Sequence, residues 1–265
     1  MKNYFKTTTL VYKNRILMNY IKLKLFRFVS IFMYFLFSFI ATSKEKNIIK
    51  ECKNYSFATT SDYHLWQLLF LFKKINKKNF SGNFVECGTW KGIYLVFFQK
   101  LIELYKLKDS KIYGFDTFEG FPEPSKSKDF SADGKSMLKR YRISKLSKNK
   151  NSWNYAGINE VKKNFFNNTL KNKNLNLFKG KVEDTLIKKK NIPYNIAILK
   201  LDTCLYSGTK IELEVLYPQV ISGGIIIIDN YFNYSGVKKA TKDFFKKKKN
   251  IIKYSYILDR VVIYK

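Results

Sequence analysis

The sequence predicts an α/β fold in which helices cover both faces of an open, mostly parallel sheet. Two apolar runs, Ile196–Leu201 and Ile225–Ile228, are continuous except at Lys200, and they do not alternate with polar residues. Such runs are typical of strands buried on both faces of a parallel sheet. Between them, Ser207–Tyr217 carries apolar residues at helical spacing. A strand, helix and strand in this order place both strand ends at the same edge of the sheet, where open α/β sheets bind ligands.

The other elements continue this alternation of helices and strands. Helices are expected at Asp62–Ile75, Ile93–Leu107, Ile158–Asn168 and Val237–Lys246, and strands at Phe84–Val85, Lys111–Phe115 and Asn174–Lys179. The chain should close with an antiparallel pair at Ile251–Leu258 and Arg260–Tyr264. The polar stretch 125–156 follows a Gly/Pro loop and is either a lid over a substrate or a disordered insertion.

The chain divides into an N-terminal part, 1–60, and one α/β domain, 61–265. Residues 25–41 are strongly apolar apart from Arg27, while 42–60 are polar and are interpreted as a linker. The uninterrupted apolar part is short for a spanning helix. It fits a membrane anchor or interfacial helix, a secretory signal starting at Met18, or a helix that packs on the domain or a second copy.

The strongly positive charge does not by itself indicate a nucleic-acid partner. The formal net charge is +30, but nearly all of it comes from lysines spread along the chain. Arginine, which gives bidentate contacts to bases and phosphates, is scarce. We therefore expect a solvated lysine coat that can attract anionic ligands or lipids, and no nucleic-acid groove.

The cysteines and the single histidine restrict the chemistry. Three cysteines without metal-binding spacing suggest a reducing compartment. The single histidine, His64, lies in an apolar predicted helix and is interpreted as structural. With this one histidine, a Ser-His-Asp triad or a His-rich zinc site is not expected.

Acidic and amide side chains follow the two central strands. Asp202 ends one strand, and Asp229 and Asn230 end the next, so the three should lie side by side. Two carboxylates and an amide oxygen suit a hard cation such as Mg²⁺. The alternative is that each Asp only caps a helix or a turn.

A second group of residues marks a loop that could hold an anionic or ribose-containing ligand. Glu86 lies near the end of a strand, and Gly88 and Gly92 flank the turn into the next helix. Glycine permits a tight turn and close backbone approach, and a helix N-terminus favours anions. Asp116, at the end of the following strand, is suited to bridging two ribose hydroxyls.

Five segments, taken together and in order, resemble the macrocin-type sugar O-methyltransferases, which are class I enzymes that use S-adenosylmethionine (SAM). The segments are NFVECGTWKG, YGFDTFEGFPEP, INEVKKNFF followed by LFKGKVEDTL, LKLDTCLYSGT and GGIIIIDNY. The resemblance covers about residues 60–265. It implies a Rossmann-like, seven-stranded sheet with a C-terminal antiparallel hairpin, and Mg²⁺-dependent methyl transfer to a sugar hydroxyl.

The resemblance also implies roles for individual residues. Glu86, Gly88 and Gly92 would hold the methionine part of SAM, Asp116 the ribose, and Glu183 or Asp184 the adenine. Asp202, Asp229 and Asn230 would bind the metal, with Asp202 as the catalytic residue.

The sequence departs from the family pattern at two points. Cys204 stands where the family has a second aspartate, and a thiol is a poor Mg²⁺ ligand. The lid, unlike that of some relatives, has no histidine.

The expected function is SAM-dependent, Mg²⁺-dependent O-methylation of a sugar or glycosylated small molecule. Two alternatives stay open: a protein of the same fold with metal-independent or lost catalysis, and a membrane-tethered binding module. Because SAM is made in the cytosol, the domain is expected there, free or attached to the membrane through 25–41. The expected partner is a small-molecule or glycan acceptor, and a homo-oligomer is compatible with the sequence.

Overall fold

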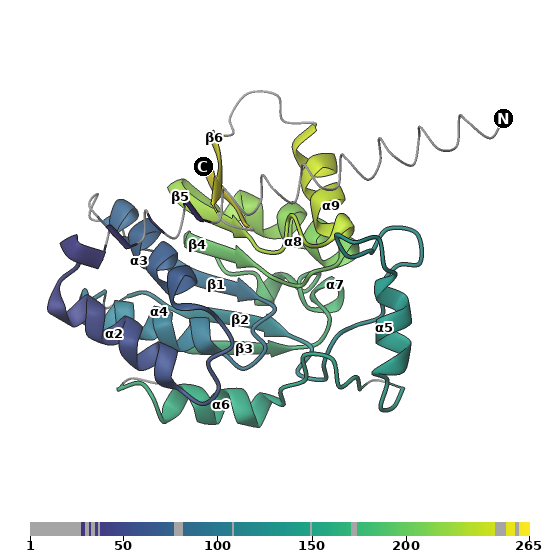
Figure 1. Ribbon diagram of the computed structural model, residues 1–265, viewed down its shortest axis with the longest axis horizontal. Helices are drawn as coiled ribbons and strands as arrows, with labels where there is room; N and C mark the ends of the chain where they lie inside the picture. Colours follow the sequence, from purple (N-terminus) through teal and green to yellow (C-terminus); the bar gives the residue numbers. More distant parts are fainter. Residues whose placement is uncertain are drawn as a thin grey trace.

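The structure is a computed structural model of the 265-residue chain (Figure 1). It describes residues 28, 29, 32, 35, 36, 38–76, 82–107, 109–148, 150–170, 174–246, 253–257 and 260–265, with the backbone alone described for 253–257.

One sheet organises the chain, and its strands lie in the order β3-β2-β1-β4-β5-β7-β6. All neighbours pair in parallel as far as β5, whereas β7 runs antiparallel to both β5 and β6. This confirms the predicted α/β fold with a mostly parallel sheet and a C-terminal antiparallel pair. The strands are β1 Asn83–Cys87, β2 Ile112–Asp116, β3 Leu175–Lys179, β4 Ile196–Leu201, β5 Val220–Ile228, β6 Lys253–Ile257 and β7 Arg260–Tyr264.

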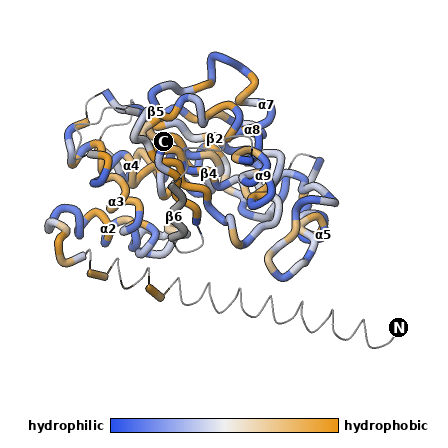
Figure 2. Tube along the Cα trace, turned by 90° about the horizontal axis from the view of Figure 1, so that it is seen from above, coloured by the Kyte–Doolittle hydropathy of each residue, from blue (hydrophilic) through white to orange (hydrophobic). Residues whose placement is uncertain are grey.

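Helices cover both faces of this sheet. Viewed from above, α2, α3 and α4 lie on one side of the strands and α8 and α9 on the other (Figure 2). The helices are α2 Ser43–Asn54, α3 Asp62–Asn76, α4 Ile93–Leu104, α5 Met137–Ile143, α6 Ile158–Phe166, α7 Val182–Thr185, α8 Tyr206–Leu216 and α9 Ser235–Lys246, and the 3₁₀ turns are η1 Lys189–Asn191 and η2 Tyr217–Gln219.

The two faces of the sheet form two separate apolar layers. One layer packs Leu65 of α3 and Phe97 of α4 against Ile198, and the other packs Leu213 of α8 and Val237 of α9 on the opposite face. Every residue of β4 is buried. Continuous apolar strands are stable here because neither face meets water.

Residues 43–54, interpreted from the sequence as linker, form the helix α2. The Thr42 hydroxyl accepts the Glu45 N–H, and the Glu45 carboxylate accepts the Thr42 N–H at 2.7 Å. This capping box satisfies two backbone donors that would otherwise lack partners. Ile49 and Cys52 then bury one side of the helix. The prediction of a linker was wrong because the apolar stripe of α2 is narrow and its start is marked only by the short Thr42/Glu45 capping box.

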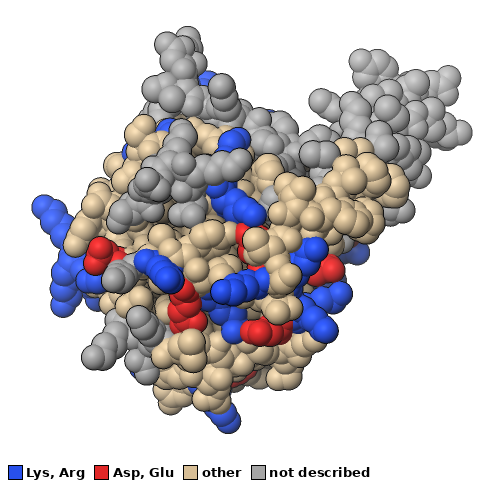
Figure 3. Space-filling view, turned by 90° about the vertical axis from the view of Figure 1, so that its left-hand side faces the viewer, with Lys and Arg blue, Asp and Glu red and all other residues tan. Residues whose placement is uncertain are grey.

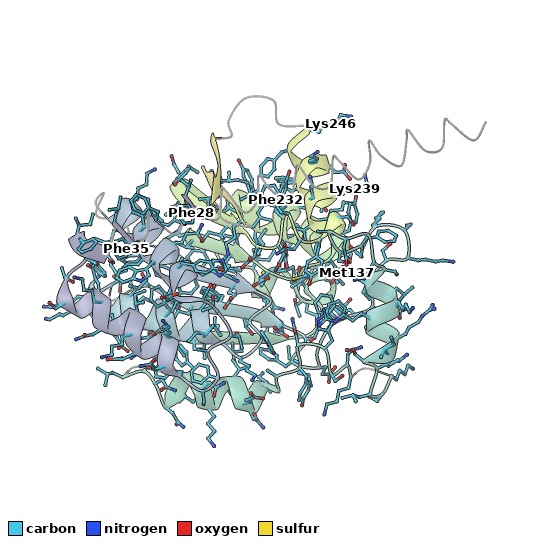
Figure 4. The ribbon with its side chains drawn as sticks, in the orientation of Figure 1. Phe28, Phe35, Met137, Phe232, Lys239 and Lys246 are labelled. Carbon is cyan, nitrogen blue, oxygen red and sulfur yellow. The ribbon has the colours of Figure 1, made fainter. Side chains whose placement is uncertain are left out.

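The stretch 125–156 has a defined structure over its described residues, 125–148 and 150–156. Asp129 accepts the backbone N–H of Tyr206 at 2.9 Å and that of Ser125 at 2.7 Å. Met137 begins α5 and is buried in a cluster with Trp153 at the carboxyl side of the sheet (Figure 4). The interpretation as disorder is therefore wrong for these residues, and a role as a lid stays a prediction.

Most of the apolar segment 25–41 lies outside the described residues. Of those described, Phe28, Phe35 and Phe39 are helical, and each residue is more than half exposed. Within the described parts of the chain, no helix is both long and apolar enough to cross a membrane.

Lysines near α2 and α3 are interleaved with acids. Lys53 pairs with Asp62 at 3.3 Å and Lys100 with Glu51 at 2.8 Å. The face shown in Figure 3 accordingly has positive and negative side chains next to one another. Exposed pairs of this kind contribute little to stability, but they prevent a continuous positive stripe on this face.

Candidate functional site

A cavity of about 460 Å³ opens at the carboxyl ends of the strands. Its volume lies in the range of small-molecule sites, and its position is where open α/β sheets bind ligands. Of the nine candidate site residues predicted from the sequence, seven line it: Glu86, Gly88, Asp116, Glu183, Asp202, Asp229 and Asn230. Gly92 and Asp184 are not among the lining residues.

The loop after β1 approaches the neighbouring strand end so closely that it requires glycine. Gly88 has a φ of 83°, and a Cβ there would lie 2.5 Å from the carbonyl oxygen of Asp202. Gly92, also with a φ of 83°, is the N-cap of α4. A side chain at Gly88 would therefore displace the strand end that carries Asp202.

Asp116 braces this loop from the end of β2. One carboxylate oxygen accepts the backbone N–H groups of Thr89 (2.8 Å) and Trp90 (2.9 Å), and the other accepts that of Phe118 (2.8 Å). Burial raises the pKa of Asp116, and these backbone hydrogen bonds oppose the rise. A carboxylate can accept about four hydrogen bonds, so little capacity is left for a ribose.

The buried ammonium of Lys200 lies at the centre of the site. Its Nζ is 2.6 Å from Asp202, 3.2 Å from Glu86 and 3.2 Å from Asp229, and it lies 4.2 Å from the centre of the Tyr94 ring. Burial would lower the pKa of Lys200, but the surrounding carboxylates raise it well above the ordinary value. Lys200 is therefore charged.

The three carboxylates around Lys200 titrate differently. Burial raises the pKa of Glu86 to about 8, because Lys200 compensates only in part. Burial, together with the nearby Asp229, raises the pKa of Asp202 to about 6. Burial acts on Asp229 too, but Arg260 and Lys200 outweigh it and hold its pKa below the usual range.

Arg260, the first residue of β7, extends the network to the other side of the cavity. It lies 2.8 Å from Asp229 and donates to Tyr94 (2.7 Å) and Gln67 (3.1 Å). The Tyr94 hydroxyl in turn contacts Thr60. This chain of contacts joins β5 and β7 to the loop before α3.

Two residues beside Asp202 have strained backbones. Cys204 has a φ of 65° and Asn230 a φ of 59°, values that residues other than glycine rarely adopt. Asn230 donates its amide to Asp202 Oδ1 at 2.8 Å, and the Cys204 thiol lies 3.5 Å from the same oxygen. Burial raises the pKa of Cys204 well above its usual value, so the thiol is neutral.

The predicted magnesium ligands are brought together, but they do not form an open donor set. Each carboxylate oxygen of Asp202 and Asp229 already accepts a hydrogen bond or ion pair from Lys200, Arg260 or Asn230. Within the described part of the chain, no cluster of three or more His, Cys, Asp or Glu side chains could hold a metal ion. The arrangement as it stands does not fit a resident Mg²⁺.

The turn between β3 and α7 and the start of α8 form the other end of the cavity. Gly180, Val182 and Glu183 line it, together with Gly208. A Cβ on Gly208 would lie 2.6 Å from the Thr203 hydroxyl oxygen, so α8 approaches the end of β4 closely. A flat group such as a purine could enter here without meeting a side chain from position 208.

The sequence reasoning missed several residues of the site. Lys200 interrupts an apolar strand, and a lysine buried in such a run needs acidic partners, which is the signal that points to it. Arg260 and Tyr94 gave no signal, because their partners are distant in sequence. His64, interpreted as structural, lines the cavity with Nδ1 3.2 Å from the Ser61 hydroxyl.

Comparison with known proteins agrees with this arrangement. The sequence model described as Macrocin-O-methyltransferase matches residues 41–264. The demethyldecarbamoylnovobiocin O-methyltransferase of Streptomyces niveus is 28% identical over 167 residues, which are 63% of this chain and 59% of that protein. A tetracenomycin-C 4'-O-methyltransferase of Streptomyces olivaceus, whose substrate name includes a dimethoxy-rhamnosyl group, is 28% identical over 151 residues, 57% of this chain and 53% of that protein. The chain thus spans a little over half the length of these relatives.

Among solved structures, the O-methyltransferase NovP aligns with a TM-score of 0.65 at 24% identity. The alignment covers 76% of this chain and 79% of that one. The order of the strands, the antiparallel end and the cavity at the carboxyl edge define an α/β methyltransferase fold. Because the family model covers most of the chain, the protein belongs to the macrocin O-methyltransferase family.

Proposed function

We propose that this chain transfers the methyl group of SAM to a hydroxyl of a sugar or glycosylated small molecule. One observation carries the proposal: a single cavity joins the glycine loop after β1 to the carboxylate cluster at the ends of β4 and β5. The family and the names of the relatives support methyl transfer to oxygen. The seven-stranded sheet of class I methyltransferases belongs to the same proposal, and the strand order supports it.

In this proposal the glycine loop would hold SAM. Glu86, with one buried carboxylate oxygen that lacks a hydrogen-bond partner, faces the methionine ammonium, and the loop between Gly88 and Gly92 approaches the rest of the amino acid. Asp116, which mainly holds the loop, would contact the ribose. Val182, with Glu183 or Asp184, would hold the adenine.

Asp202 is the proposed catalytic residue. Its side chain is 23% exposed, whereas that of Asp229 is 6% exposed, so an acceptor hydroxyl can reach Asp202 more readily. The hydroxyl oxygen forms a bond to the methyl carbon while the carbon–sulfur bond breaks and its electron pair stays on sulfur. The hydroxyl proton passes to the Asp202 carboxylate. The Cys204 thiol beside it is neutral and does not act as a base, so Asp202 is the nearest proton acceptor.

The test is release of S-adenosylhomocysteine (SAH) from SAM with a panel of nucleotide sugars and rhamnosides as acceptors. Turnover with at least one sugar is expected, and Asp202→Ala should abolish it while keeping SAM binding. Asp133→Ala is the matched control, because Asp133 is an exposed lid residue paired with Lys135. An unchanged rate in Asp202→Ala would refute the catalytic role.

A second candidate function is SAM binding without catalysis. The observation that favours it is Cys204, which places a neutral thiol where the family has a carboxylate. Under this alternative, the chain binds SAM but releases no SAH with any acceptor, and Cys204→Asp restores turnover.

We also propose that the apolar segment at 25–41 associates with an anionic membrane surface. The exposed phenylalanines at 28, 35 and 39 and the net charge of +30 support this. Flotation with phosphatidylglycerol vesicles at high salt tests it, because salt screens the lysine coat that both chains share: the full chain should float, and a chain starting at Ser43 should not. Equal flotation of both chains would refute the role of the segment.

A further inference from the structure

The contacts of Lys200 use the full hydrogen-bonding capacity of its ammonium group. A lysine has three N–H donors and no acceptor, and three carboxylates lie within 3.2 Å of its Nζ. Its side chain is 1% exposed, so water does not complete this shell. One buried cation is therefore shared by the cofactor side of the cavity, at Glu86, and the acceptor side, at Asp202 and Asp229.

The oxygens that a divalent ion would need are turned toward donors of the protein. The second oxygen of Asp202 accepts from the Asn230 amide at 2.8 Å, and the second oxygen of Asp229 accepts from the Asn230 backbone N–H at 3.0 Å. Asn230 has its own amide oxygen held by Asn233 Nδ2 at 3.1 Å. Turning the amide over would set two oxygens against each other at Asp202 and two nitrogens against each other at Asn233.

The charges of the cluster also argue against a bound Mg²⁺. Even with Glu86, Asp202 and Asp229 all ionised, only three negative charges face the two fixed cations, Lys200 and Arg260, and all five groups are largely buried. Adding Mg²⁺ would leave the buried cluster with an excess of positive charge, which is costly away from water. Mg²⁺ also needs near-octahedral oxygen ligands, and the thiol of Cys204 cannot supply one.

We infer that the ammonium of Lys200 is the resident cation of this site and replaces the divalent metal expected from the family. Lys200 is a positioning residue: it holds Asp202 and Asp229 together at the acceptor end and compensates their charge. Methyl transfer in this chain then proceeds without Mg²⁺. This inference rests on the proposed function for the reaction, but the cation site can be tested without any acceptor.

The test is titration of the full chain with Mn²⁺, whose free-ion electron paramagnetic resonance signal falls when the ion binds. The wild-type chain and Asp202→Asn should show the same Mn²⁺ binding, with and without SAH, because Asp202 holds no metal ion in the wild type. Lys200→Met keeps the three carboxylates but removes their shared cation, so it should bind Mn²⁺ at least about tenfold more tightly than the wild type. Lys210→Met is the matched control, because Lys210 is an exposed lysine of α8, and it should behave as the wild type.

Two results would overturn the inference. One is Mn²⁺ binding by the wild-type chain that is lost in Asp202→Asn. This comparison does not need Lys200→Met, so it stays valid if that variant does not fold. The other is a folded Lys200→Met chain, judged by circular dichroism, with no gain in Mn²⁺ binding. SAH binding, measured on the same samples, separates these results from a failure of the methyltransferase proposal, which would show as absence of SAH binding.

Discussion

Replacing Asp116 with asparagine should destabilise the fold before it affects any reaction. The carboxylate accepts three backbone N–H bonds, from Thr89, Trp90 and Phe118, all between 2.8 and 2.9 Å. An amide has one acceptor oxygen, so the bonds to Thr89 and Trp90 can stay while an NH₂ group faces the Phe118 N–H. Hydrogen bonds to a charged group contribute about 1.5–3 kcal/mol each, and the two that remain become neutral and weaker.

Burial raises the pKa of Asp116, which shows that burying its charge costs free energy. The neutral asparagine avoids this cost, and that offsets part of the loss. We therefore expect Asp116→Asn to lower the free energy of unfolding by roughly 2–4 kcal/mol. Urea unfolding measures it, with the exposed Asp133→Asn as the control. An unfolding free energy within about 0.5 kcal/mol of the wild type, together with a large loss of SAH affinity, would contradict the reasoning and make Asp116 a ribose ligand instead.

Two further predictions concern glycine and a buried carboxyl. Gly88→Ala should destabilise the chain by roughly 3 kcal/mol and weaken SAH binding, because its Cβ meets the Asp202 carbonyl; Gly134→Ala, with the same positive φ but open space, should cost only about 1 kcal/mol. Equal effects in urea unfolding would show that backbone strain alone matters. Burial raises the pKa of Glu212 to about 8, so the folded chain keeps a proton that the unfolded chain loses above its ordinary pKa of 4.5. Stability should thus fall as pH rises between these values, and Glu212→Gln should gain roughly 1–3 kcal/mol over the wild type at pH 8 but little near pH 4; a gain independent of pH in thermal unfolding would refute this.

The sheet could be predicted because burial on both faces leaves a strong sequence pattern. Ile196–Leu201 and Ile225–Ile228 are continuous apolar runs, and their carboxyl ends carry Asp202 and Asp229, which share one cavity. Parallel pairing of β4 with β5 is enough to bring these two residues together.

The partners of these residues could not be predicted, because they depend on side chains that meet across the fold. Arg260 is distant in sequence from Asp229 and reaches it only because β7 pairs with β5. Asp116 was expected to face a ligand, yet its oxygens turn to the backbone of its own loops. Lys200 was visible as an anomaly in a buried strand, and only the structure shows which acids surround it.

Calorimetric titration of the full chain with SAM and SAH tests the central claim most directly. Binding of both ligands, with an affinity lowered in Gly88→Ala and unaffected by EDTA, is the result that the structure predicts. Absence of binding to a folded chain would contradict the methyltransferase proposal and leave the family likeness as one of fold alone.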